Sequence, residues 1–243
     1  MQITGKLAKC FIALTVLAGM VVLVRALTLW QFGHHSWFLY LAILSVFASQ
    51  LRVSLPGVNG SMSVNLPFIL LALSRLSFSE AILIAGLSTF AQCLPKPGKQ
   101  IKLVQTIFNV SNIMNATGLG FLAARSAMNG NLLDPSLLIG LAGVTFFLAE
   151  TVPVAAVISL TEHKSTAKIW RELFVLTSPY FFLSAGVAAT AAAALQHVGW
   201  SIPTLTLILM YSTYRSFRAY FHPLAVGVPV PSGARSMSAA AGR

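Results

Sequence analysis

Long apolar runs recur along the whole chain, and they constrain its fold more than any other feature of the sequence. Each run holds roughly 18 to 25 residues with few charges, enough for a helix to cross the ~30 Å hydrocarbon core of a bilayer. Of the 243 residues, 56% are hydrophobic and 9% are charged, whereas soluble domains carry about 25% charged residues. Backbone groups in lipid must be hydrogen-bonded within their own segment, so helices are the expected elements. The sequence therefore predicts an all-α fold, a polytopic transmembrane helical bundle.

The runs predict about eight spans, or six to eight if the two shortest are re-entrant. The predicted spans are residues 8–30, 37–51, 62–76, 78–94, 103–128, 135–160, 177–194 and 202–220. Residues 169–176 are amphipathic, and we expect them to lie in the membrane interface ahead of the seventh span. The first run begins with lysines as a signal peptide does, but it is too long for one, so we expect it to be retained.

The net charge of +11 comes from Lys and Arg residues in short clusters between the apolar runs. Cytoplasmic loops of membrane proteins carry such clusters, so we interpret the charge as topology rather than as a nucleic-acid-binding surface. Placing every Lys-rich loop in the cytoplasm puts both termini there as well. Residues 1–221 form the predicted transmembrane domain. Residues 222–243 are rich in Pro, Gly, Ser and Ala, which predicts a disordered basic cytoplasmic tail.

We expect the rest of the chain to be organised around residues 52–94. A polar turn at 56–61 contains Asn59 between glycines that tolerate positive φ, so the chain must bend between two apolar runs. Two short apolar segments follow with almost no loop between them. The second opens at Ser77, and Glu80 suits the first turn of its helix. A hydroxyl-rich turn and a carboxylate exceed what bilayer insertion requires, so this stretch predicts a binding site.

Two other spans carry polar residues that need partners inside a bilayer. Gln105, Asn109 and Asn112 recur at helical spacing, so they either hydrogen-bond to neighbouring helices or line a polar cavity. Glu150 lies deep in an apolar run, where it is either a functional residue or a protonated or Arg-paired group that fixes helix packing. The predicted ligand-binding residues are Asn59, Ser61, Ser63, Glu80, Gln105, Asn109, Asn112 and Glu150.

Catalytic and metal-binding motifs are absent from the sequence. It has no HExxH, no GxxxxGK[ST], no GxSxG and no DxxxD carboxylate pair. Cys10 and Cys93 are far apart, and His34 and His35 are adjacent rather than one helical turn apart, so neither pair predicts a metal site. We therefore expect a non-enzymatic protein without a cofactor. Its expected partners are the lipid bilayer, a small or lipophilic ligand and a cytoplasmic or membrane signalling protein, and not nucleic acid.

The central stretch also resembles a bacterial family. The residues that carry the resemblance are LPGVNGSMSVNLPFILLALSRLSFSEAILI, then Gln92-Cys93, a basic Pro-containing loop, and VQTIFNVSN at 104–112. They are similar to the multi-span membrane-sensor region that precedes diguanylate cyclase (GGDEF) and HD-GYP domains. The match covers about residues 51–120, and the turn 56–63 and Phe108-Asn109 are its main positions. The resemblance implies a bacterial inner-membrane module that senses an unknown signal.

One departure from that family concerns its output domain. The segment 211–221 keeps the Tyr and Arg content of the helix that leads into the catalytic domain in the relatives, but His222-Pro223 and a short tail follow it. We therefore expect a sensor-like ligand-binding module that passes its signal to a separate partner. The alternative is a solute transporter, or the substrate-binding membrane subunit of one. Transporters often carry a discontinuous helix in each of two repeats, and only one such interruption is found here.

Overall fold

The computed structural model is a helical bundle with one short β-hairpin inserted into it. It describes residues 5–30, 35–54, 61–94, 102–129, 135–162, 165–198 and 201–227. The elements within these ranges are, in order, α1 (Lys6–Thr28), α2 (His35–Gln50), β1 (Arg52–Ser54), β2 (Ser61–Ser63), α3 (Leu66–Arg75), α4 (Phe78–Cys93), α5 (Leu103–Asn129), α6 (Pro135–Glu162), α7 (Thr166–Val198) and α8 (Ser201–Gly227). The predicted all-α class is confirmed, apart from the two strands of three residues each.

Three helices in the described part of the chain are long and apolar enough to cross a membrane. They cover Lys6–Thr28, Leu138–Glu162 and Thr177–Leu195. Shorter apolar helices cover Ser36–Gln50, Leu66–Arg75 and Phe78–Cys93. Each predicted span contains a helix, although the number of membrane crossings stays a prediction.

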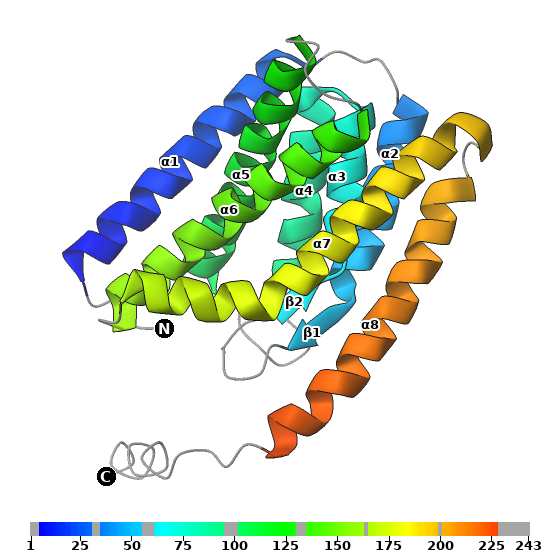
Figure 1. Cartoon of the computed structure of the whole chain (residues 1–243). Helices are drawn as coiled ribbons and strands as arrows, with labels where there is room; N and C mark the ends of the chain where they lie inside the picture. The colour runs from blue at the N-terminus through cyan, green and yellow to red at the C-terminus, as the bar shows by residue number, and fades with distance from the viewer. Residues whose placement is uncertain are drawn as a thin grey trace.

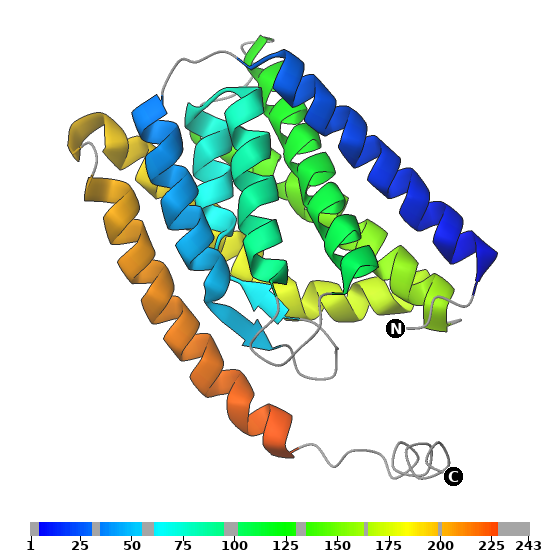
Figure 2. The same cartoon turned by 180° about the vertical axis from the view of Figure 1, so that it is seen from behind.

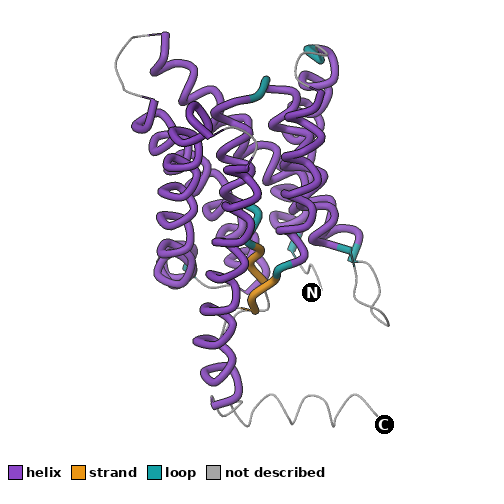
Figure 3. The backbone as a smooth tube through the Cα atoms, turned by 90° about the vertical axis from the view of Figure 1, so that its right-hand side faces the viewer, coloured by secondary structure: helices purple, strands orange, loops and turns teal. Residues whose placement is uncertain are grey.

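The helices run up and down in two layers with α3 between them. One layer holds α2, α4, α5 and α1 side by side (Figure 2), and the other holds α6 and α7 (Figure 1). Helix α3 contacts α2, α4, α5, α6 and α7, so it occupies the centre of the bundle. Helix α1 begins and α8 ends at the lower end of the view in Figure 1. Helix α8 extends past the other helices at that end (Figure 3).

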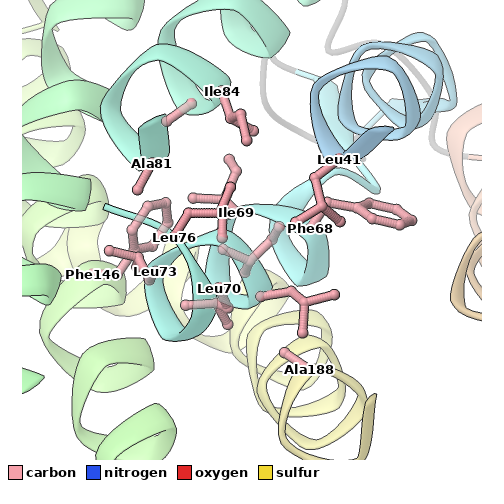
Figure 4. Packing of buried hydrophobic residues seen from close by; sticks show 14 of the residues in the cluster. Leu41, Phe68, Ile69, Leu70, Leu73, Leu76, Ala81, Ile84, Phe146 and Ala188 are labelled. Carbon is pink, nitrogen blue, oxygen red and sulfur yellow. The ribbon is translucent and has the colours of Figure 1, made fainter. Parts of the chain in front are cut away.

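Helix α3 forms the core of the protein. Its residues from Leu66 to Leu73 are all buried. Figure 4 shows the side chains of Phe68 and Leu70 packed toward Leu41 of α2 and Ala188 of α7. A helix of 10 residues is only about 15 Å long, which is half of a hydrocarbon core. The predicted span at 62–76 is therefore divided, with β2 at its start and a short buried helix in the remainder.

The hairpin explains how the chain enters this buried helix. Strands β1 and β2 pair antiparallel, with Arg52 opposite Ser63 and Ser54 opposite Ser61. The predicted bend lies between these antiparallel strands, although residues 55–60 lie outside the described residues. The Arg52 guanidinium donates to the carbonyl oxygens of Ala91 (3.3 Å) and Leu94 (3.4 Å) at the end of α4. A cation is favourable there because the carboxyl end of a helix is electronegative.

Local sequence signals fix several other elements. The predicted cap of α4 is confirmed, because Ser77 and Glu80 form a reciprocal capping box.

Helix α1 lies so close to α5 that a Cβ on Gly19 would be 2.5 Å from Ser111 Cβ. The amphipathic segment 169–176 is the first part of the continuous helix α7, which contains Pro179 and changes direction along its length (Figure 1). Proline removes a helical hydrogen bond and is the usual cause of such bends.

Helix α8 differs from the prediction at its end. It continues to Gly227 and so extends into the predicted tail, whereas residues 228–243 lie outside the described residues. Pro223 removes one helical hydrogen bond, to the carbonyl of Ala219. Ala219 is exposed, so water can satisfy that carbonyl and the helix does not have to end.

Candidate functional site

Polar side chains from five parts of the fold meet around the junction between β2 and α3. We call this group the central polar layer: Ser63, Asn65, Ser88, Gln92, Asn112, Glu150 and Tyr180. The layer lies within an otherwise apolar cluster built on α3. Polar groups in such surroundings require hydrogen-bond partners, so their contacts can be followed one by one.

The first contacts join the β2–α3 junction to α4. Ser63 Oγ lies 2.8 Å from Asn65 Oδ1 and 2.9 Å from Gln92 Oε1. A hydroxyl carries one proton, so Ser63 donates to one of these oxygens at a time. Asn65 Nδ2 donates to Ser88 Oγ at 3.1 Å. Ser63, Asn65 and Ser88 are buried, and these bonds hold the start of α3 against the last turns of α4.

Tyr180 joins the same junction to α7. Its hydroxyl donates to the backbone oxygen of Ser63 at 2.8 Å and accepts from the backbone N–H of Leu66 at 3.3 Å. The first N–H groups of a helix have no partner within the helix. Tyr180, which is 2% exposed, therefore satisfies a donor that would otherwise be unpaired at the buried start of α3.

Asn112 and Glu150 join α5 to α6. Asn112 Nδ2 donates to the backbone oxygen of Glu150 at 2.9 Å. The side chain of Asn112 is 2% exposed. Within the described residues, its Oδ1 atom is buried without a hydrogen-bond partner. One half of this amide is thus used for helix packing, and the other half is an unused acceptor.

The Glu150 carboxylate connects this pair to Tyr180. It lies close enough to Tyr180 for a direct electrostatic interaction. The Glu150 side chain is half-buried. In the part of the chain that the structure describes, no hydrogen bond or ion pair satisfies its carboxylate. An unpaired carboxylate in a candidate membrane span is costly, which distinguishes Glu150 from the other members of the layer.

The structure brings together three of the predicted site residues, namely Ser63, Asn112 and Glu150. Asn109 lies in a neighbouring group, where its Nδ2 atom is 3.8 Å from the sulfur of Cys93. Gln105 is exposed near the start of α5. The sequence left two interpretations for this face of α5, hydrogen bonds to neighbouring helices or the lining of a polar cavity. The structure shows hydrogen bonds to neighbouring helices for Asn109 and Asn112.

The other predicted residues lie apart from the layer or outside the described residues. Glu80 is buried at the opposite end of α4 from Ser88 and Gln92, where its Oε2 atom accepts from the N–H and the hydroxyl of Ser77. Its local capping role accounts for that oxygen. Asn59 lies outside the described residues. Ser61 pairs with Ser54 in the hairpin, and its side chain lies outside the described part.

The sequence prediction missed four members of the layer: Asn65, Ser88, Gln92 and Tyr180. Two signals were present. Ser88 and Gln92 stand one helical turn apart on α4, so they share a face. Tyr180 follows a proline inside an apolar run, where a hydroxyl needs a partner. Neither signal identifies that partner, because Tyr180 and Ser63 are 117 residues apart in the sequence.

The layer offers hydroxyl, amide and carboxylate groups, which suit hydrogen bonding and charge recognition. No group of three or more His, Cys, Asp or Glu residues that could hold a metal ion is found in the described ranges. Comparisons of the chain with protein-family models, with curated proteins and with solved structures find no match.

Proposed function

We propose that this chain is a non-catalytic integral membrane protein that binds a small ligand at the central polar layer. The observation that carries the proposal is the unpaired Glu150 carboxylate, which interacts with Tyr180 and belongs to a residue whose backbone oxygen accepts from Asn112. Hydrogen bonds between elements account for Ser63, Asn65 and Tyr180 as packing residues. None of these hydrogen bonds uses the Glu150 carboxylate. An unpaired ionisable group in a membrane span is costly, so Glu150 is a candidate functional residue.

The proposed topology has eight crossings, with both termini in the cytoplasm of a bacterial cell. In it the hairpin and α3 together make the third crossing, because α3 alone is too short. The basic residues support this orientation. At the end where α1 begins and α8 ends, the described Lys and Arg residues are Lys6, Lys9, Arg52, Lys102, Lys168, Arg171, Arg215 and Arg218. Those at the opposite end are Arg25, Arg75 and Arg125. The excess at one end fits the positive-inside rule for a cytoplasmic membrane.

In this proposal the module reports ligand binding to a partner, as the sensor resemblance implies. Helix α8 is the element available for that contact, because it extends past the bundle at the cytoplasmic end (Figure 3). Arg218 and Tyr214 are hydrogen-bonded along it at 3.2 Å. A second candidate is a transporter or its substrate-binding subunit, and α3 favours it. A short helix that starts inside the bundle next to polar groups is typical of transporter binding sites.

The test is a thermal-shift screen of the detergent-purified protein against metabolites, lipids and quinones. A ligand of the native state at 100 times its Kd stabilises the fold by about 2.7 kcal/mol. We expect at least one compound whose shift is lost in Glu150→Gln and kept in the control Glu172→Gln, since Glu172 is exposed on α7. If no compound class stabilises the protein, or if both variants respond like the wild type, this site is not a ligand site.

Uptake measurements separate the two candidate functions. The protein is reconstituted into vesicles, and a radiolabelled hit is added outside. A sensor module binds the ligand without accumulating it. Time-dependent accumulation inside the vesicles would favour the transporter.

A further inference from the structure

The acceptors of the central polar layer restrict the ligand that it would bind. Two of them have no donor within the described residues, the Glu150 carboxylate and Asn112 Oδ1. Asn112 Oδ1 is buried and the Glu150 side chain is half-buried, and an acceptor shielded from water without a donor is destabilising, more so when it is charged. These two acceptors also belong to one helix contact, because the Asn112 amide nitrogen is bonded to the Glu150 backbone. A complementary ligand must therefore supply donors.

The cationic side chains before and after the central helix, Arg52 of β1 and Arg75 at the end of α3, have other partners. Arg52 is hydrogen-bonded to carbonyl oxygens at the end of α4. Arg75 is hydrogen-bonded to the carbonyl oxygen of Ala192 on α7. The group that faces Glu150 from α7 is the Tyr180 hydroxyl, whose proton is already donated to Ser63. Within the described ranges, the charge of Glu150 therefore has no cationic partner.

An aromatic cluster lies on the same side of α6 as Glu150. Phe146 and Phe147 precede Glu150 by one helical turn, so they lie on the same side of α6. The Phe147 ring lies 4.4 Å from the Phe181 ring, and the Phe146 ring lies 6.2 Å from it, measured between centroids. Such an aromatic cluster suits the hydrocarbon part of an organic cation, and aromatic rings also attract positive charge.

We infer that the ligand is a protonated organic amine, with its ammonium group on Glu150 and Asn112 Oδ1 and its apolar part against the Phe146–Phe147–Phe181 cluster. The inference rests on the proposed function and adds the ligand class to it. A bare Mg²⁺ or Ca²⁺ ion fits less well, because such ions need six or more oxygen ligands. Quinones and carboxylates fit less well because their oxygens are hydrogen-bond acceptors, as are the Glu150 carboxylate and Asn112 Oδ1.

The experiment uses three matched probes with the full-length protein in detergent: 2-phenylethylamine, 2-phenylethanol and 3-phenylpropionate. The same three classes, amines, alcohols and carboxylates, are then compared across a compound library by thermal shift and equilibrium dialysis. We expect stabilisation by amines only. Replacing the charged acceptor in Glu150→Gln should weaken amine binding about 10- to 100-fold, whereas Glu172→Gln should leave it unchanged.

The possible outcomes separate this inference from the function on which it rests. Stabilisation by alcohols or carboxylates but not by amines would overturn the ligand class and leave a binding module. Amine binding that Glu150→Gln does not change would also overturn the assignment to this site. No stabilisation by any class would overturn the proposed function together with the inference.

Discussion

Replacing Tyr180 by Phe tests whether one hydroxyl anchors the buried start of α3. The substitution keeps the ring, so no large cavity forms, but it removes the bonds to Ser63 O (2.8 Å) and from Leu66 N (3.3 Å). Each buried backbone group left without a partner costs about 1 to 3 kcal/mol. Because the second bond is long, we expect a total loss of about 2 to 4 kcal/mol in the free energy of unfolding.

The assay is thermal unfolding of the purified protein in detergent. For a chain of this size about 1 kcal/mol corresponds to roughly 2 to 4 °C, so Tyr180→Phe should lower Tm by about 4 to 16 °C. The matched control is Tyr211→Phe on α8, since Tyr211 is 46% exposed. Exposed substitutions change stability by about 0.5 kcal/mol or less. If the two variants melt within the same few degrees, the Tyr180 hydroxyl does not anchor α3, and our account of the junction is wrong.

Further substitutions test the packing of α1 and the ends of α4. Gly19→Ala would place a Cβ 2.5 Å from Ser111 Cβ, so α1 must shift and Tm should fall. Gly140→Ala is its control, because a Cβ there meets nothing within 4 Å, and an equal fall in both variants would contradict the close approach. Ser77→Ala should cost about 1 kcal/mol by removing the cap of α4, and Tm is again the measure. Arg52→Gln should destabilise by a similar amount through the carbonyls at the other end of α4, and an unchanged Tm would show that these long bonds contribute nothing.

The helices could be predicted from the sequence because each depends on local information. An apolar run of sufficient length predicts a helix whatever its neighbours are. The cap at Ser77 and Glu80 depends on residues three positions apart. The hairpin is harder to predict, since strands of three residues are too short to show alternation. The turn residues between them predicted only that the chain bends.

The membership of the polar layer could be predicted only in part, because its contacts join distant segments. Asn112 and Glu150 stood out as polar groups in apolar runs, but nothing in their sequence spacing of 38 residues indicates that they meet. The polar face of α5 from Gln105 to Asn112 shows a second limit of the prediction, because the sequence does not say which of its residues are buried. Seven residues of helix extend about 10 Å, so one face passes from the exposed start of α5 to the buried interior of the bundle.

The short helix α3 explains why the fold and the candidate site depend on the same residues. A helix that starts inside an apolar bundle leaves N–H donors there that lipid cannot satisfy. Tyr180 satisfies one of these donors and also lies beside Glu150. Helix α7 holds the other end of α3 as well, through the bond from Arg75 to the carbonyl oxygen of Ala192. Under the proposed function, a ligand bound at the Glu150 carboxylate therefore lies next to Tyr180, the residue that anchors α3. Under that proposal, binding at the layer would be coupled to the position of the central helix.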